Sequence, residues 1–124
     1  MLREAQVTPF LATTDLKRAR DFFEGTLGLP VLSLDSFALV LKTPNGSMRV
    51  TQVQEHALAP YTVLGWDVSD VHAVVQGLAL RGVMFKRYPG MDQDELGIWT
   101  APSGSRIAWF NDPDGNVLSV AQHP

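Results

Sequence analysis

The stretch TDLKRARDFFEGTLGL, residues 14–29, contains the signals of a complete helix with both of its ends. Apolar residues recur at helical spacing between positions 16 and 27. Asp15 is a good N-cap, because its carboxylate can accept a hydrogen bond from a free backbone N–H of the first turn. Gly28 can take the left-handed conformation that ends many helices. We therefore predict a helix between these two residues.

Apolar segments of strand length surround this helix. We expect strands at residues 6–13, 31–34, 37–42 and 48–53. The last two segments are separated by Thr43-Pro44-Asn45-Gly46, and Asn-Gly is a strong signal for a β-hairpin.

The second half of the chain repeats this order. A strand expected at residues 61–68 is followed by Ser69-Asp70, so the second capping aspartate comes 55 residues after the first. Residues 71, 74, 75 and 78 form an apolar helical stripe, and Gly82 stands where a terminating glycine is expected. Further strands are expected at residues 83–88, 97–100, 106–110 and 117–122.

The repeat predicts an α+β fold in a single domain spanning residues 1–124. Two strand–helix–three-strand modules are expected, at residues 1–55 and 60–124, with residues 54–60 between them. Each helix covers one face of its sheet. We expect the other faces to curve into a cup, which is a common place for a small ligand.

Composition excludes several classes of function. The 124 residues include no cysteine, so disulfides, thiolate metal sites and cysteine nucleophiles are absent. The net charge is −3, and the one basic cluster, residues 17–20, reads as a solvated helix face, so we expect no nucleic-acid partner. No apolar run is long enough to span a bilayer, and no secretory signal is evident. We expect a cytoplasmic protein without a membrane partner.

Two motifs resemble a known family. FNDPDGN, residues 110–116, precedes a short last strand, and DFFEGTLGL, residues 21–29, resembles the family's first-helix pattern, with Phe23 where tyrosine is more usual. Together with the repeat, they make the chain similar to the vicinal oxygen chelate superfamily, also called the glyoxalase/bleomycin resistance protein/dioxygenase superfamily. The resemblance implies paired βαβββ modules, a homodimer and a cup for a small molecule. In many members, His, Gln and Glu side chains from four strands hold one divalent metal.

The resemblance places these four ligand positions at Thr8, Arg49, Val63 and Ser119. Valine cannot coordinate a metal, and a guanidinium is always charged and offers no lone pair. We therefore expect no metal and no other cofactor.

Strand alternation then assigns further residues to the cup. Trp66 falls on the opposite, core-facing side. The predicted ligand-binding residues are Thr8, Phe10, Arg49, Thr51, Val63, Asp67, Trp99, Trp109 and Ser119. Arg49 could bind a carboxylate, or it could pair with Asp67 or Glu95 and hold the scaffold.

Three functions remain open at this point. The leading hypothesis is a metal-independent protein that binds an aromatic or antibiotic-like small molecule and could sequester it. The alternative is an enzyme of the same superfamily, a lyase, isomerase or dioxygenase with an atypical or absent metal site, for which Asp67 is the candidate general base. The third is a structural module whose cup is filled by Phe10, Trp99 and Trp109. No catalytic residue is assigned, and no Ser/His/Asp order is evident in the sequence.

Overall fold

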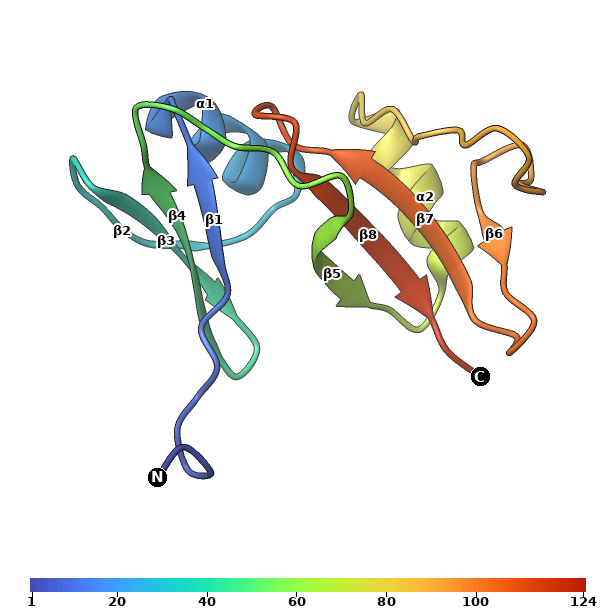
Figure 1. Ribbon diagram of the computed structural model, residues 1–124, viewed down its shortest axis with the longest axis horizontal. Coiled ribbons are helices and arrows are strands. Elements are labelled where there is room, and N and C mark those ends of the chain that lie inside the picture. The colour runs from blue at the N-terminus through green and yellow to red at the C-terminus, as the bar shows by residue number, and fades with distance from the viewer. The chain divides into compact units, whose positions relative to one another are not determined.

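A computed structural model describes all 124 residues. The chain divides into two compact units, residues 1–57 and 58–124. Each unit is a four-stranded mixed sheet with helical structure packed on it (Figure 1). Neither α-helix is long and apolar enough to cross a membrane.

The first unit has the order βαβββ. Its elements are β1 (Phe10–Thr13), α1 (Leu16–Arg20), η1 (Asp21–Thr26), β2 (Val31–Leu34), β3 (Ala38–Thr43) and β4 (Gly46–Gln52). The strands lie in the order β1-β4-β3-β2. β1 runs parallel to β4, and the other pairs are antiparallel.

The second unit repeats this arrangement. Its elements are β5 (Thr62–Asp67), α2 (Val71–Leu80), β6 (Trp99–Thr100), β7 (Arg106–Asn111) and β8 (Val117–Gln122). The strand order β5-β8-β7-β6 matches that of the first unit, and its first and last strands are again parallel neighbours. The predicted fold class, two βαβββ modules, is confirmed.

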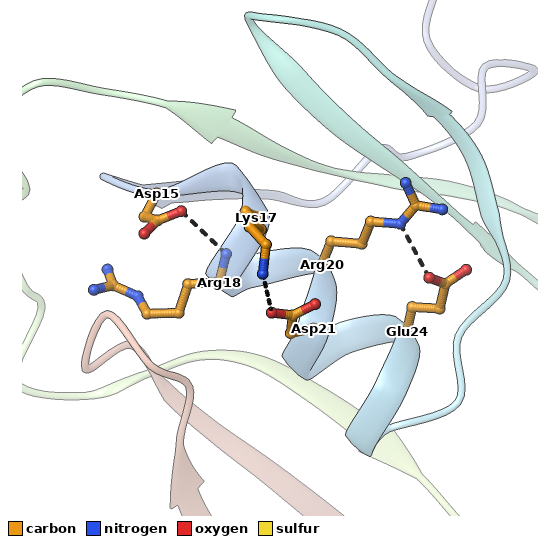
Figure 2. A network of polar contacts seen from close by, with 6 residues as sticks. All are labelled: Asp15, Lys17, Arg18, Arg20, Asp21 and Glu24. Carbon is orange, nitrogen blue, oxygen red and sulfur yellow. Dashed lines mark hydrogen bonds and ion pairs between the residues drawn. The ribbon is translucent and has the colours of Figure 1, made fainter.

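The two capping aspartates act as predicted. The Asp15 carboxylate accepts a hydrogen bond from the Arg18 backbone N–H at 3.1 Å (Figure 2), and the Asp70 carboxylate accepts one from the Ala73 N–H at 3.0 Å. Gly28 follows the first helical segment with a φ of 76°. The local signals at the helix ends were therefore sufficient to locate both helices.

The first helix differs from the prediction in its interior. Only α1 is α-helical, and η1 continues it as wider π-helical turns, in which the Leu27 N–H donates to the Phe22 carbonyl at 2.9 Å. Gly25 and Thr26, which are poor α-helix formers, lie in the wide part. On the solvated face, Lys17–Asp21 and Arg20–Glu24 ion pairs join successive turns (Figure 2).

The predicted hairpin is present, but its turn is different. Thr43 pairs with Gly46, so Pro44 and Asn45 form the two-residue loop. No residue other than glycine has a positive φ. Asn45 therefore does not take the left-handed conformation that an Asn-Gly turn would require.

The strands expected at residues 6–13 and 97–100 are shorter in the structure, and the strand expected at residues 83–88 is absent. β1 begins at Phe10, so Thr8 lies before the sheet and is exposed. Residues 83–88 form no regular strand, and their only ladder contact is an isolated bridge between Phe85 and Phe110. The loop that follows residue 88 supplies hydrogen bonds to this segment through the Gln93 side chain, in place of a neighbouring strand.

Each sheet buries one face. In the first unit the fully buried side chains include Phe23, Leu39, Leu41, Met48 and Val50. In the second they include Val71, Val75, Phe110 and Leu118. The strand residues between these positions point to the opposite side of each sheet, which no helix covers.

Candidate functional site

The uncovered side of the second sheet carries most of the predicted site. We call it the open face and define it by the strand residues that alternate with the buried ones. Pairing aligns Gly65, Ser119 and Trp109 across three strands. A second row consists of Asp67, Ala121, Ile107 and Trp99. Asp67, Trp99, Trp109 and Ser119, all predicted site residues, thus lie on one face of one unit.

Three aromatic rings gather on the open face. The Trp99 and Trp109 ring centroids are 6.2 Å apart, with planes inclined by 35°. The Tyr88 ring stands edge-on to Trp109, with centroids 5.5 Å apart and planes at 89°. All three side chains are half-buried. They form an aromatic wall that could stack against a flat ligand.

Trp66 lies on the other side of the sheet. Its ring stacks on buried Phe110, with centroids 6.4 Å apart and planes inclined by 20°. The predicted side of the sheet agrees with this contact, although the Trp66 side chain is half-buried and does not belong to the fully buried core.

Gln93 positions the loop that supplies Tyr88. Its side-chain oxygen accepts a hydrogen bond from the Tyr88 N–H at 2.8 Å, and its amide nitrogen donates to the carbonyls of Lys86 and Gly97, each at 2.9 Å. Sequence analysis missed Tyr88 and Gln93, because a single glutamine in an irregular loop carries no pattern. The alternation of residues 85–88 was the one available signal for Tyr88.

Lys86 places a cation beside the aromatic wall. Its Nζ donates to the Asn111 side-chain oxygen at 3.1 Å and lies 5.7 Å from the centroid of the Tyr88 ring. No carboxylate lies within ion-pair distance of this ammonium group. Partial burial raises the pKa of Tyr88, so its hydroxyl stays neutral beside this charge at pH 7.

At the far end of the open face, three polar side chains form a chain of contacts. His123 Nε2 is 3.3 Å from Asp67 Oδ1, and His123 Nδ1 is 2.8 Å from Ser105 Oγ. This Ser/His/Asp arrangement was not evident from the sequence, because its members are far apart in the chain. The Asp67 side chain is 81% exposed, so it lacks the desolvated surroundings expected of a strong general base.

The first unit holds the other predicted site residues on its own uncovered face. Phe10 pairs with Arg49, whose guanidinium carbon is 5.9 Å from the Phe10 ring centroid. Hydrogen bonds from the Phe37 and Ala38 N–H groups, together with the Arg49 charge, hold the pKa of Asp35 below its usual value. Arg49 thus has a carboxylate in its vicinity.

Three predicted site residues remain, Thr51, Thr8 and Val63. Thr51 pairs with Ala12, beside the Arg49 position on the same face of the first sheet. Thr8 lies outside the sheet, before β1. Val63 is in β5, at an irregularity of the β5–β8 pairing, and is 40% exposed.

The two units also show that Arg49 and Ser119 occupy equivalent positions. Arg49 pairs with Phe10, five residues before the Asp15 cap, and Ser119 pairs with Gly65, five residues before the Asp70 cap. The two residues therefore lie at matching points of the last strand in each unit.

The residues at the four positions that the sequence resemblance assigned to metal ligands do not fit a divalent metal. Arg49 is a cation, Val63 has no donor atom, and Thr8 and Ser119 offer only neutral hydroxyls. Nowhere in the chain do three His, Asp or Glu side chains cluster in a way that could hold a metal ion.

Comparisons with known proteins agree with this fold. The chain belongs to the glyoxalase/bleomycin resistance protein/dioxygenase superfamily, whose family model matches residues 5–120. No curated protein sequence matches the chain at a significant level.

Solved structures with the same fold share little sequence with the chain. A glyoxalase family protein from Bacillus anthracis has a TM-score of 0.75 at 16% identity, covering 100% of both chains. A lactoylglutathione lyase from Agrobacterium tumefaciens has a TM-score of 0.70 at 20% identity, covering 96% of this chain and 93% of its own. A glyoxalase/bleomycin resistance protein/dioxygenase from Nocardioides has a TM-score of 0.74 at 15% identity, covering 98% and 84%.

Proposed function

We propose that this chain is a metal-independent small-molecule binding protein that holds a flat aromatic ligand on the open face of its second unit. The observation that carries the proposal is the aromatic wall of Tyr88, Trp99 and Trp109. Rings of this kind bind planar ligands through large contact areas and offset or edge-to-face packing.

Half-burial of the wall supports binding over a purely structural role. The Trp99 and Trp109 side chains are half-buried, although Ala108 and Phe110, which flank Trp109 in β7, are fully covered. Surface tryptophans that gather on one sheet face are costly to leave in water, which favours a face that is covered by a partner in use.

The side chains at the four positions that hold the metal in other family members support a function that requires no metal. The side chains at the family's ligand positions are a cation, an apolar group and two hydroxyls. Binding by stacking requires none of the Lewis-acid chemistry that a metal supplies.

A binding measurement with a neutral aromatic probe tests the proposal. We expect 2-naphthamide to bind the wild-type protein saturably in isothermal titration calorimetry, and Trp109→Leu and Trp99→Leu to weaken it at least fivefold. Trp66→Phe is the matched control, because its ring lies on the opposite side of the sheet. Near-UV circular dichroism checks that each variant is folded. Unchanged affinity in both leucine variants would overturn the proposal.

Metal independence is tested separately. We expect no stoichiometric metal by elemental analysis after the protein is exposed to Mn, Fe, Ni and Zn, and equal probe affinity with and without a chelator. About one metal per chain, lost on changing a residue of the open face, would contradict this part and make the enzyme hypothesis lead.

One observation favours enzymatic activity as the second candidate function. If Ser105 Oγ gives its proton to His123 Nδ1, while the His123 Nε2–H donates to Asp67, the hydroxyl could attack an activated ester. A fluorophosphonate reagent should then label Ser105 in the wild-type protein and not in the His123→Gln variant. Absence of labelling would remove this candidate.

The homodimer implied by the family resemblance also remains a prediction. Light scattering coupled to size-exclusion chromatography would measure it directly. A dimer whose formation depends on Trp99 and Trp109 would indicate that the aromatic wall is an interface between copies, and would count against the proposed ligand site.

A further inference from the structure

We propose that the ligand of the open face is an aromatic carboxylate, or a planar anion of similar shape, whose negative charge is bound by Lys86. This inference rests on the proposed function and adds the charge and the orientation of the ligand. From the sequence, Arg49 in the other unit was one candidate for binding a carboxylate, with a pairing role in the scaffold as the alternative.

The backbone places Lys86 directly beside the aromatic wall. Its N–H donates to the Trp109 carbonyl at 2.8 Å, so the two residues are neighbours across the edge of β7. Phe85 packs against buried Phe110, with ring centroids 5.6 Å apart, and therefore points to the covered side. The next side chain, Lys86, points to the open face, as its contact with Tyr88 also shows.

The charge of Lys86 is oriented but not neutralised. Asn111 accepts one of its three donors and the Tyr88 ring lies against it, and neither group carries a negative charge. The other candidate cation near the wall, Arg87, directs its guanidinium to the backbone carbonyls of Gln93 and Glu95. An ammonium group held in place without a carboxylate partner is well suited to bind an anionic ligand.

Distances along β7 indicate the end of the open face at which the carboxylate of the ligand would bind. Trp109 and Asn111 are two residues apart, which is about 7 Å along a strand and comparable to the reach of a bicyclic aromatic acid. Ser105 and His123 lie at the other end, four residues from Trp109, or about 13 Å. Asp67 at that end would also repel an anion. The carboxylate is therefore directed toward Lys86.

Two ligands of nearly the same shape, one anionic and one neutral, test the inference. We expect 2-naphthoate to bind the wild-type protein roughly tenfold more tightly than 2-naphthamide in calorimetry, the gain typical of one charge-assisted hydrogen bond. Lys86→Met should remove this preference by lowering the affinity for naphthoate much more than the affinity for the amide, which loses at most one hydrogen bond to a neutral acceptor. Lys86→Arg should retain most of the preference. The preference should also fall as the salt concentration rises, because salt screens a partly exposed charge pair.

Arg49→Met is the matched control, since it removes a cation from the uncovered face of the first unit. It should leave the preference for naphthoate intact. The inference is overturned if Lys86→Met keeps the preference, or if Arg49→Met abolishes it. Equal binding of both ligands by the wild-type protein would also overturn it while leaving the proposed function standing. If neither ligand binds, the proposed function fails, and this inference fails with it.

Discussion

Ser119 lies so close over Gly65 that there is no room for a side chain at position 65. A Cβ atom added there would be 2.6 Å from the Ser119 hydroxyl oxygen. The two residues are paired neighbours on β5 and β8, and both belong to the open face. The absence of a side chain at Gly65 therefore leaves the space that the Ser119 hydroxyl occupies.

This contact predicts that the effect of Gly65→Ala depends on residue 119. In the wild-type background we expect the free energy of unfolding to fall by about 1 kcal/mol, because the hydroxyl must leave its position. In a Ser119→Ala background the same change should be neutral or stabilising by up to about 0.5 kcal/mol, because alanine loses less chain entropy on folding. Gly65 does not have a positive φ, so its backbone tolerates alanine. Urea unfolding of the four proteins measures both effects, and equal costs in the two backgrounds would contradict the steric explanation.

Removing the hydrogen bonds of the Gln93 side chain should destabilise the loop that supplies Tyr88 to the aromatic wall. Gln93→Leu keeps the approximate volume and removes three part-buried hydrogen bonds, so we expect a loss of about 2–3 kcal/mol in the free energy of unfolding. The wavelength of tryptophan fluorescence should also shift, because the backbone of Gln93 pairs with that of Trp99 in an isolated β-bridge.

The control for this change is Gln76→Leu, the same substitution at an exposed position of α2. It should alter the free energy of unfolding by no more than about 0.5 kcal/mol. If both variants behave alike, the Gln93 hydrogen bonds do not hold the loop in solution.

Much of the fold could be predicted because its signals are local. Asp15 and Asp70 each cap a helix within three residues, and terminating glycines and hairpin signals act over similarly short distances. The periodicity of the sequence then assigned Trp66 to one side of the sheet and Trp109 to the other. The prediction of a continuous α-helix between Asp15 and Gly28 was wrong, because no pattern in the sequence distinguishes the π-helical turns of η1 from an α-helix.

Less of the candidate site could be predicted, because its contacts join distant segments. Ser105 and His123 meet only because their neighbours Arg106 and Gln122 are paired on β7 and β8. Lys86 reaches the aromatic wall through an irregular segment that was expected to be a strand. Strand alternation predicts the face on which a side chain lies, but it does not identify neighbours contributed by loops.

The two capping aspartates provide a comparison between the repeated units. Asp15→Ala and Asp70→Ala should each lower the free energy of unfolding by about 1 kcal/mol, because each leaves one N–H of the first helical turn without its side-chain acceptor. Asparagine at either position should recover most of the loss. Thermal or urea unfolding of the four variants tests this, and equal losses for alanine and asparagine would contradict the explanation by the side-chain hydrogen bond.

We expect the contribution of Asp112 to the free energy of unfolding to change with pH in the direction opposite to that of most aspartates. Burial raises the pKa of its carboxyl above the usual 3.8, outweighing the hydrogen bonds from Asn116 that lower it. As the pH falls from 7 through this raised pKa toward 3.8, the folded protein takes up a proton before the unfolded chain does. The contribution of Asp112 to the free energy of unfolding should therefore increase over this interval and level off below 3.8.

The Asp112→Asn variant isolates this contribution, because asparagine keeps the shape of the side chain and does not titrate. At pH 7 the variant loses one of the two oxygens that accept hydrogen bonds from Asp114 and Asn116, so it has a constant cost of its own. The difference in the free energy of unfolding between wild type and variant should then widen in favour of the wild type as the pH is lowered. Urea unfolding of both proteins at several pH values between 7 and 3.5 measures this difference. If the difference narrowed instead, hydrogen bonding would dominate over burial at Asp112, and the pKa of this carboxyl would be depressed in the folded protein.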